Sequence, residues 1–255
     1  MVDRGLHPRL FRLCHFVARF ILKLNTSVAK ESIVSMNLLY RYYHLKGIIL
    51  FTGIVTMSIL IAMLSRLILI NELVFYNTYS EQLTVERSLE LFEYMQQVSW
   101  VGYAFIPVML LLKFTLISTV IYTAVFFFNL NDKTGFGAVF KVVVASEFIF
   151  IIVALIRFLW FLFFGGNYDL NDLSFFYPLS LINLFEISEV DKMWIYPLQI
   201  INLFQIIYIL LISWALKNVC KLGDALSEKI VLSSYLPAMV IWIVLIMFLT
   251  LETAA

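Results

Sequence analysis

The sequence predicts an all-α, polytopic membrane protein, built as a bundle of five transmembrane helices. Hydrophobic residues make up 62% of its 255 residues and the mean hydropathy is +0.94, whereas a soluble domain is about 45–50% apolar. Five apolar stretches are also long enough to cross a bilayer, which takes about 20 helical residues. These stretches lie near 47–70, 101–128, 138–164, 194–216 and 230–250.

A basic tail, residues 1–46, precedes the first stretch. Between residues 8 and 24, apolar residues recur at helical spacing on one face, and basic residues lie on the other: Leu10, Leu13, Val17, Phe20 and Leu24, against Arg12, His15, Arg19 and Lys23. This pattern is typical of an amphipathic helix that lies in the membrane interface and is attracted by anionic lipids. We expect a cytoplasmic amphipathic tail, for which docking of a partner is the alternative role, followed by a membrane domain over 47–255.

The distribution of Lys and Arg predicts the orientation. They are concentrated in the tail and in the short connections 129–141 and 217–229, whereas the opposite side has only Arg87 and Lys192. Under the positive-inside rule the N-terminus is cytoplasmic and the C-terminus external. The short loops favour a bacterial inner membrane. A helix is expected at 81–97, in the polar segment between the first two spans.

Two segments are nearly identical. Residues 177–187 read YPLSLINLFEI and residues 196–206 read YPLQIINLFQI, so that eight of eleven positions match. Pro suits the first turn of a helix, and Tyr suits the membrane–water boundary. The second copy would therefore begin the fourth span at the outer face. The first copy is followed by acids at once, and we expect it to form a short interfacial helix at 178–188.

Four charges fall inside the predicted spans. Lys113 and Glu147 both lie near the middle of the bilayer, on adjacent spans, and we expect them to form a buried pair. Its role stays open between fixing the helix packing and transport. Arg66 and Arg157 lie in the outer third of their spans, where they either snorkel to the headgroups or line an outward cavity. In that cavity, lined also by Asn183, Gln199, Asn202 and Gln205, they would contact an anion or lipid headgroup or the acids of 165–193.

No motif of a catalytic or metal site is present. The sequence lacks H-E-x-x-H, Walker A, G-x-S-x-G and C-x-x-C patterns, and its three histidines all precede the first span. We therefore expect no enzyme activity, cofactor, metal or nucleic-acid partner. Expected partners are membrane lipids and either other membrane-protein subunits or further copies of the chain.

Two phrases near the fourth span resemble the Yip1-domain family, whose bacterial members often carry a similar segment. They are FYPLSLINL at 176–184 and NLFQIIYILLISWALK at 202–217, and the resemblance covers residues 175–250. Residues 1–170 match in topology alone, and the DLYGP-like loop of eukaryotic members is not present. The resemblance implies a five-span protein without enzyme activity, tied in eukaryotes to vesicle trafficking and small GTPases.

From the sequence we expect a non-enzymatic accessory or scaffold subunit of a membrane transport or export assembly. The alternative is a self-contained lipid or small-molecule transporter that uses the intramembrane charges. A third function is that of a membrane-embedded enzyme, for which no acid, base and nucleophile set is visible. A stoichiometric protein partner would favour the subunit, and a lone protein with lipid in its core the transporter.

Overall fold

The computed structural model describes residues 36–79, 83–130, 132–166, 168–185 and 189–254, and these residues are helical with no strand. The chain divides into two compact units, Met1–His44 and Leu45–Ala255. In the first, residues 36–43 are helical; the amphipathic helix expected at 8–24 lies outside the described residues. The second unit holds all the long helices and is described below.

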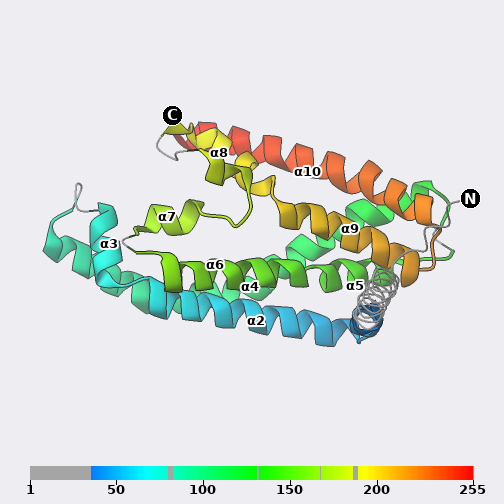
Figure 1. The fold of residues 1–255 in the computed structure, drawn as a ribbon, viewed down its shortest axis with the longest axis horizontal. Coiled ribbons are helices and arrows are strands. Elements are labelled where there is room, and N and C mark those ends of the chain that lie inside the picture. The colour runs from blue at the N-terminus through cyan, green and yellow to red at the C-terminus, as the bar shows by residue number, and fades with distance from the viewer. Residues whose placement is uncertain (1–35, 80–82, 131, 167, 186–188, 255) are drawn as a thin grey trace, which may run out of the picture. The chain divides into compact units, whose positions relative to one another are not determined.

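The helices of the second unit lie side by side along one direction (Figure 1). They are α2 (Gly47–Leu69), α3 (Glu72–Tyr79), α4 (Val85–Phe127), α5 (Phe136–Ser146), α6 (Phe148–Phe164), α7 (Leu170–Phe175), the 3-10 helix η1 (Leu181–Leu184), α8 (Lys192–Ile200), α9 (Leu203–Asn218) and α10 (Asp224–Ala254). α4 packs on α5 and α10, α2 packs on α6, and α10 also packs on α8 and α9.

Four helical segments are long and apolar enough to cross a membrane: α2, α4, the α5–α6 pair and α10. They coincide with the first, second, third and fifth predicted spans. α4 also includes most of the helix expected at 81–97, so that one helix of 43 residues stands where the sequence predicts a separate helix and the second span. α4 and α10 continue through Pro107 and Pro237. The described part of this chain is therefore a membrane-type helical bundle.

The fourth predicted span, 194–216, is not a single helix. α8 ends at Ile200 and α9 begins at Leu203 after a break at Ile201 and Asn202. Asn202 is the N-cap of α9: its Oδ1 accepts from the Gln205 amide at 2.8 Å, and its Nδ2 donates to the Gln199 and Ile200 carbonyls. The Asn202 side chain forms hydrogen bonds with backbone groups that would otherwise pair within a continuous helix. A new helix therefore begins directly after Asn202.

The expected helix starts at the two Tyr-Pro pairs are also wrong. Pro197 lies inside α8, which begins at Lys192, and the described part of the first copy contains only the short η1 helix instead of an interfacial α-helix over 178–188. The reason is a contact between the copies. Ser180 forms an isolated antiparallel bridge with Asn202, in which the Leu181 amide donates to the Ile201 carbonyl and the Leu203 amide to the Leu179 carbonyl. The first copy therefore satisfies the backbone groups that the break leaves open.

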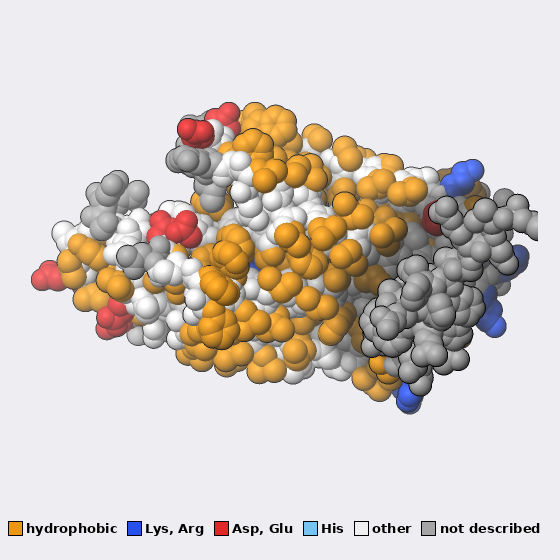
Figure 2. Space-filling model, in the orientation of Figure 1, with side chains coloured by type: hydrophobic (Ala, Val, Ile, Leu, Met, Phe, Trp, Pro, Cys, Tyr) orange, Lys and Arg blue, Asp and Glu red, His pale blue; other side chains and the backbone are white. Residues whose placement is uncertain are grey.

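Charges gather at the two ends of the described bundle. Figure 2 shows basic side chains at the end where α2 and α10 begin, most acidic side chains at the other end, and a wide apolar surface between them. This separation is typical of a protein whose ends face the two sides of a membrane.

Replacing Asn202 with Ala should destabilise the unit by about 1–2 kcal/mol, because the cap of α9 is lost at a buried break. The measurement is unfolding of the purified protein in detergent, followed by circular dichroism. Asn183 is the matched control, since it is the equivalent residue of the first copy and its exposed side chain makes one hydrogen bond, to the Tyr177 carbonyl. Equal losses for N202A and N183A would contradict this account of the break.

Candidate functional site

A partly open cavity of about 390 Å³ lies within the second unit, between α2 and α6. Single residues from α4 and α7 and from the segment after α7 complete its wall. Most of the lining is apolar, with Ile61, Leu110, Phe150, Ile151, Phe158 and Leu173 among its side chains. The volume falls in the range of small-molecule sites, about 300–1,000 Å³.

The α2 wall is made of small residues at helical spacing. Ser58, Ala62 and Ser65 follow one another on one face, and their short side chains leave space that larger residues would fill. No hydroxyl hydrogen bond of Ser58 or Ser65 is present among the described residues. By contrast, Ser146 and Ser213 bond to the carbonyl four residues earlier. Two hydroxyls of the α2 wall are therefore available to a ligand.

Glu147 lies at the junction of α5 and α6, and its side chain brings a carboxylate to the lining of the cavity. The residue is only 3% exposed. Its Oε1 accepts a hydrogen bond from Lys113 Nζ at 2.5 Å, as expected from the sequence. Its Oε2 is buried and has no hydrogen-bond partner among the described residues. One carboxylate oxygen thus accepts a hydrogen bond from α4, and the other can still accept one.

Lys113 is far less enclosed than its partner. Its side chain is 44% exposed, against 4% for that of Glu147, and its Nζ also lies 4.7 Å from the centre of the Phe150 ring. The pair thus joins an enclosed carboxylate at the α5–α6 junction to a less enclosed ammonium on α4, and a charge left without its partner at this depth is costly.

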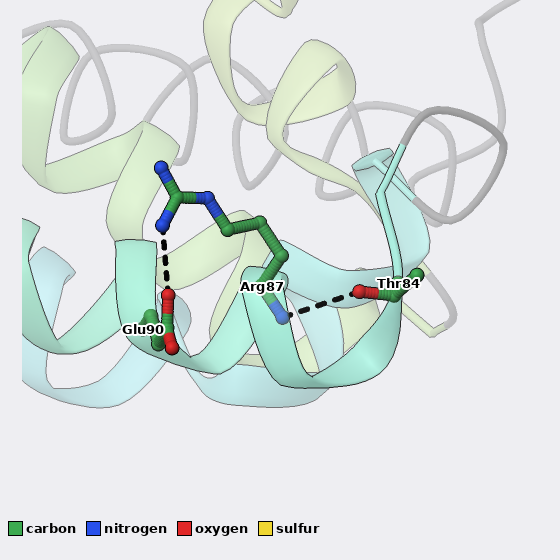
Figure 3. A network of polar contacts seen from close by, with 3 residues as sticks. All are labelled: Thr84, Arg87 and Glu90. Atoms are coloured by element: carbon green, nitrogen blue, oxygen red, sulfur yellow. Dashed lines mark hydrogen bonds and ion pairs between the residues drawn. The ribbon is translucent and has the colours of Figure 1, made fainter.

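A surface pair shows the contrast. At the start of α4 the Arg87 guanidinium donates to Glu90 at 2.8 Å, one turn from the Thr84 cap (Figure 3). Both side chains of this pair are more than 60% exposed, and such pairs contribute about 0–1 kcal/mol. The pair at Glu147 is the one that the packing of the bundle depends on.

Arg157 is the second charge of the cavity. It lies on α6, ten residues after Glu147 and so about 15 Å further along the axis. It is half-buried, and no described acid forms an ion pair with it. The guanidinium therefore has charge and donors to offer a ligand.

Tyr177 brings a phenol to the same cavity from the segment between α7 and η1. Burial raises the pKa of Tyr177 to about 12, the charge of Glu147 raises this pKa as well, and the charge of Arg157 lowers it. The phenol therefore stays protonated at neutral pH and is within electrostatic range of both charges. Its hydroxyl is a further donor or acceptor in the wall.

The remaining residues expected at an outward cavity do not line this one. Arg66 donates to the Met95 carbonyl at 2.6 Å and so joins α2 to α4. Asn183 lies beside a smaller aromatic hollow of about 240 Å³. Gln199 donates to the Phe175 carbonyl at 2.9 Å and to the Ser174 carbonyl. These three residues hold segments of the chain together.

The other two residues expected at the outward cavity, Asn202 and Gln205, lie at the break between α8 and α9 and in the first turn of α9. Asn202 caps α9, as described above. Gln205 donates from its Nε2 to the Tyr235 hydroxyl at 2.6 Å and so joins α9 to α10. Conversely, Ser58, Ser65 and Tyr177 line the cavity without having been predicted from sequence. The spacing of Ser58, Ala62 and Ser65 was the available signal, because small residues at i, i+4 and i+7 mark a face that packs closely or leaves space.

Comparison with known proteins adds no assignment: no protein-family model, curated protein or solved structure matches this chain.

Replacing Lys113 with Met should destabilise the bundle by about 3–5 kcal/mol, because it leaves the buried carboxylate of Glu147 without its partner. Glu147→Gln should cost clearly less, since it leaves no buried carboxylate and its amide oxygen can still accept from the Lys113 ammonium. The double variant K113M/E147Q should regain part of what K113M loses. Unfolding in detergent measures all three variants, with Arg87→Met as the surface control, for which we expect a change below about 1 kcal/mol. A double variant less stable than K113M would show that the pair is not what holds this junction.

Proposed function

We propose that this protein is an integral membrane protein without enzyme activity that binds a small amphipathic anion in the cavity between α2 and α6, and that it acts as a self-contained lipid or small-molecule transporter. The observation that carries the proposal is the Arg157 guanidinium, which lines an apolar cavity without an ion pair to any described acid. A charge at membrane depth is costly unless it is paired. An anionic ligand supplies the missing partner.

The charges of the cavity favour an anion over a cation. Lys113 and Glu147 neutralise one another at 2.5 Å, so that Arg157 gives the site its net positive charge. The hydroxyls of Ser58, Ser65 and Tyr177 add groups that donate to oxyanions. The apolar remainder of the wall, with Phe150 and Phe158, suits an acyl chain or another apolar moiety.

For the topology we propose five crossings, with α8 and α9 together forming a discontinuous fourth crossing. The N-terminus would be cytoplasmic, the C-terminus external, and the membrane a bacterial inner membrane. The separation of basic and acidic side chains between the two ends of the bundle supports this orientation. The five crossings are also what the resemblance of residues 175–250 to the Yip1-domain family implies.

A discontinuous crossing suits transport. Transporters often bind their substrates beside helices that are interrupted in the membrane. Here the interruption is bonded to the segment 177–184, which carries Tyr177 into the cavity wall. Movement of α8 relative to α9 would therefore move part of that wall.

The second candidate is a subunit or scaffold of a transport or export assembly, and one observation favours it. One face of α4 carries an exposed row of Thr115, Thr119 and Thr123. Polar and small side chains of this kind are enriched where membrane helices meet. This face would then contact another subunit or a second copy of the chain.

Replacing Arg157 with Leu tests the proposal directly. We expect the variant to retain at least about tenfold less acidic lipid, because the loss of a charge-assisted contact to an oxyanion is worth 1.5–3 kcal/mol. The readout is the lipid that remains bound after purification in mild detergent, quantified by mass spectrometry. Arg66→Leu is the matched control, since Arg66 lies in the same outer third but donates to Met95 outside the cavity, and its lipid content should not change.

Two outcomes would count against this function. Unchanged acidic lipid in R157L would remove the anion site. A stoichiometric protein partner that co-purifies with the chain, with no lipid in the cavity, would favour the subunit instead.

A further inference from the structure

We infer that the ligand of this cavity carries a hydrogen-bond donor in addition to its anionic group, and that Glu147 is the residue that selects for this donor. The inference rests on the proposed function and deepens it. It names the class of ligand: an amphipathic oxyanion whose headgroup also bears a hydroxyl or an ammonium group.

The first step is the free oxygen of Glu147. The Oε1 atom accepts from Lys113, while Oε2 is buried and meets no hydrogen-bond donor in the described part of the chain. An ionised carboxylate only accepts hydrogen bonds, and leaving a buried acceptor unsatisfied is unfavourable. A hydroxyl or ammonium group of the ligand supplies what this oxygen lacks. A second acceptor would be repelled there.

The second step is that Glu147 is the one charged acceptor in the described lining, where the other acceptors are neutral hydroxyls. Ser58 and Ser65 face the cavity from α2, Arg157 from α6, and Tyr177 from the segment after α7; each of these can donate to an oxyanion. Glu147 is the one acidic side chain in the described lining. The site therefore holds donors for an oxyanion and one acceptor for a donor.

The third step is the spacing of the two charges. Glu147 and Arg157 are ten residues apart, about 15 Å along the axis. Both residues line the same cavity, and the long side chain of Arg157 can cover part of this distance. A compact headgroup can then contact both residues. A cavity of about 390 Å³ has room for that headgroup, while the apolar chains follow the apolar wall.

The charge balance limits the choice further. With Lys113 paired to Glu147, an anion on Arg157 makes the site neutral overall. A hydroxyl on Glu147 Oε2 keeps this neutrality, as in a phosphodiester with a glycerol headgroup. An ammonium group gives a zwitterion, as in an ethanolamine headgroup, and leaves the site with one positive charge. The two share the same chemistry, and the neutral site favours the hydroxyl.

The test compares two lipids that differ in the donor alone. Phosphatidylglycerol and phosphatidylmethanol with the same acyl chains carry the same charge, but only the first has headgroup hydroxyls. Binding of each to the full-length protein in detergent is titrated by native mass spectrometry. We expect phosphatidylglycerol to bind at least about tenfold more tightly, which is the scale of a hydrogen bond to a charged group.

Variants assign the difference to Glu147. In the double variant K113M/E147L, which removes both members of the pair, the two lipids should bind within about twofold of each other. Arg87→Met is the surface control and should keep the preference of the wild type. The comparison of the two lipids on the wild-type protein needs no variant, so equal binding there contradicts the inference even if the double variant does not fold.

A soluble arm separates the two sources of this chemistry. If sn-glycerol 3-phosphate displaces phosphatidylglycerol, the inference is supported with a soluble ligand as the source. If it does not displace the lipid and the two lipids are still discriminated, the inference is supported with a membrane lipid.

Two results would overturn it. Equal binding of both lipids to the wild type, lost in R157L, would leave the anion site standing and remove the role of Glu147. Binding of neither lipid would remove the anion site as well.

Discussion

The ion pair of Lys113 and Glu147 fixes the junction of α5 and α6 against α4 at the centre of the bundle. Lys113 lies 14 residues before the end of α4, and Glu147 lies 11 residues after the start of α5. Both are thus about 17–21 Å from the same end of the unit, near the middle of a bilayer core about 30 Å thick. At that depth every polar group needs a partner, and the rest of the bundle follows this constraint.

The same constraint explains the two copies of the Tyr-Pro segment. A helix broken within an apolar bundle leaves backbone groups open, and the first copy satisfies them through the bridge of Ser180 and Asn202. Among the described residues, Oε2 of Glu147 lacks a hydrogen-bond partner and Arg157 lacks an ion pair, and both side chains line one cavity, whereas the unsatisfied hydroxyls of Ser118 and Thr134 lie outside its lining. Because two ionisable side chains of the same cavity have bonding capacity left, we assign the ligand to this cavity.

The spans could largely be predicted from the sequence, because the length and hydropathy of a segment decide whether it can cross a bilayer. The pairing of Lys113 with Glu147 could also be predicted, because both residues lie near the middle of the bilayer on adjacent spans. The break at Asn202 was missed, since apolar residues flank it on both sides and its partner in the bridge, Ser180, lies 22 residues earlier. Arg66 and Arg157 looked equivalent for a similar reason. Only the three-dimensional neighbours show that Arg66 donates to Met95 while Arg157 lines a cavity.

The most direct measurement is an experimental structure of the full chain in nanodiscs that contain acidic lipid, determined by cryo-electron microscopy with a bound antibody fragment. The account predicts density for a headgroup between Arg157 and Glu147, with its anionic group on the guanidinium and its apolar part along Phe150 and Phe158. A cavity closed by protein side chains, with Arg157 paired to a carboxylate of the chain itself, would contradict the account.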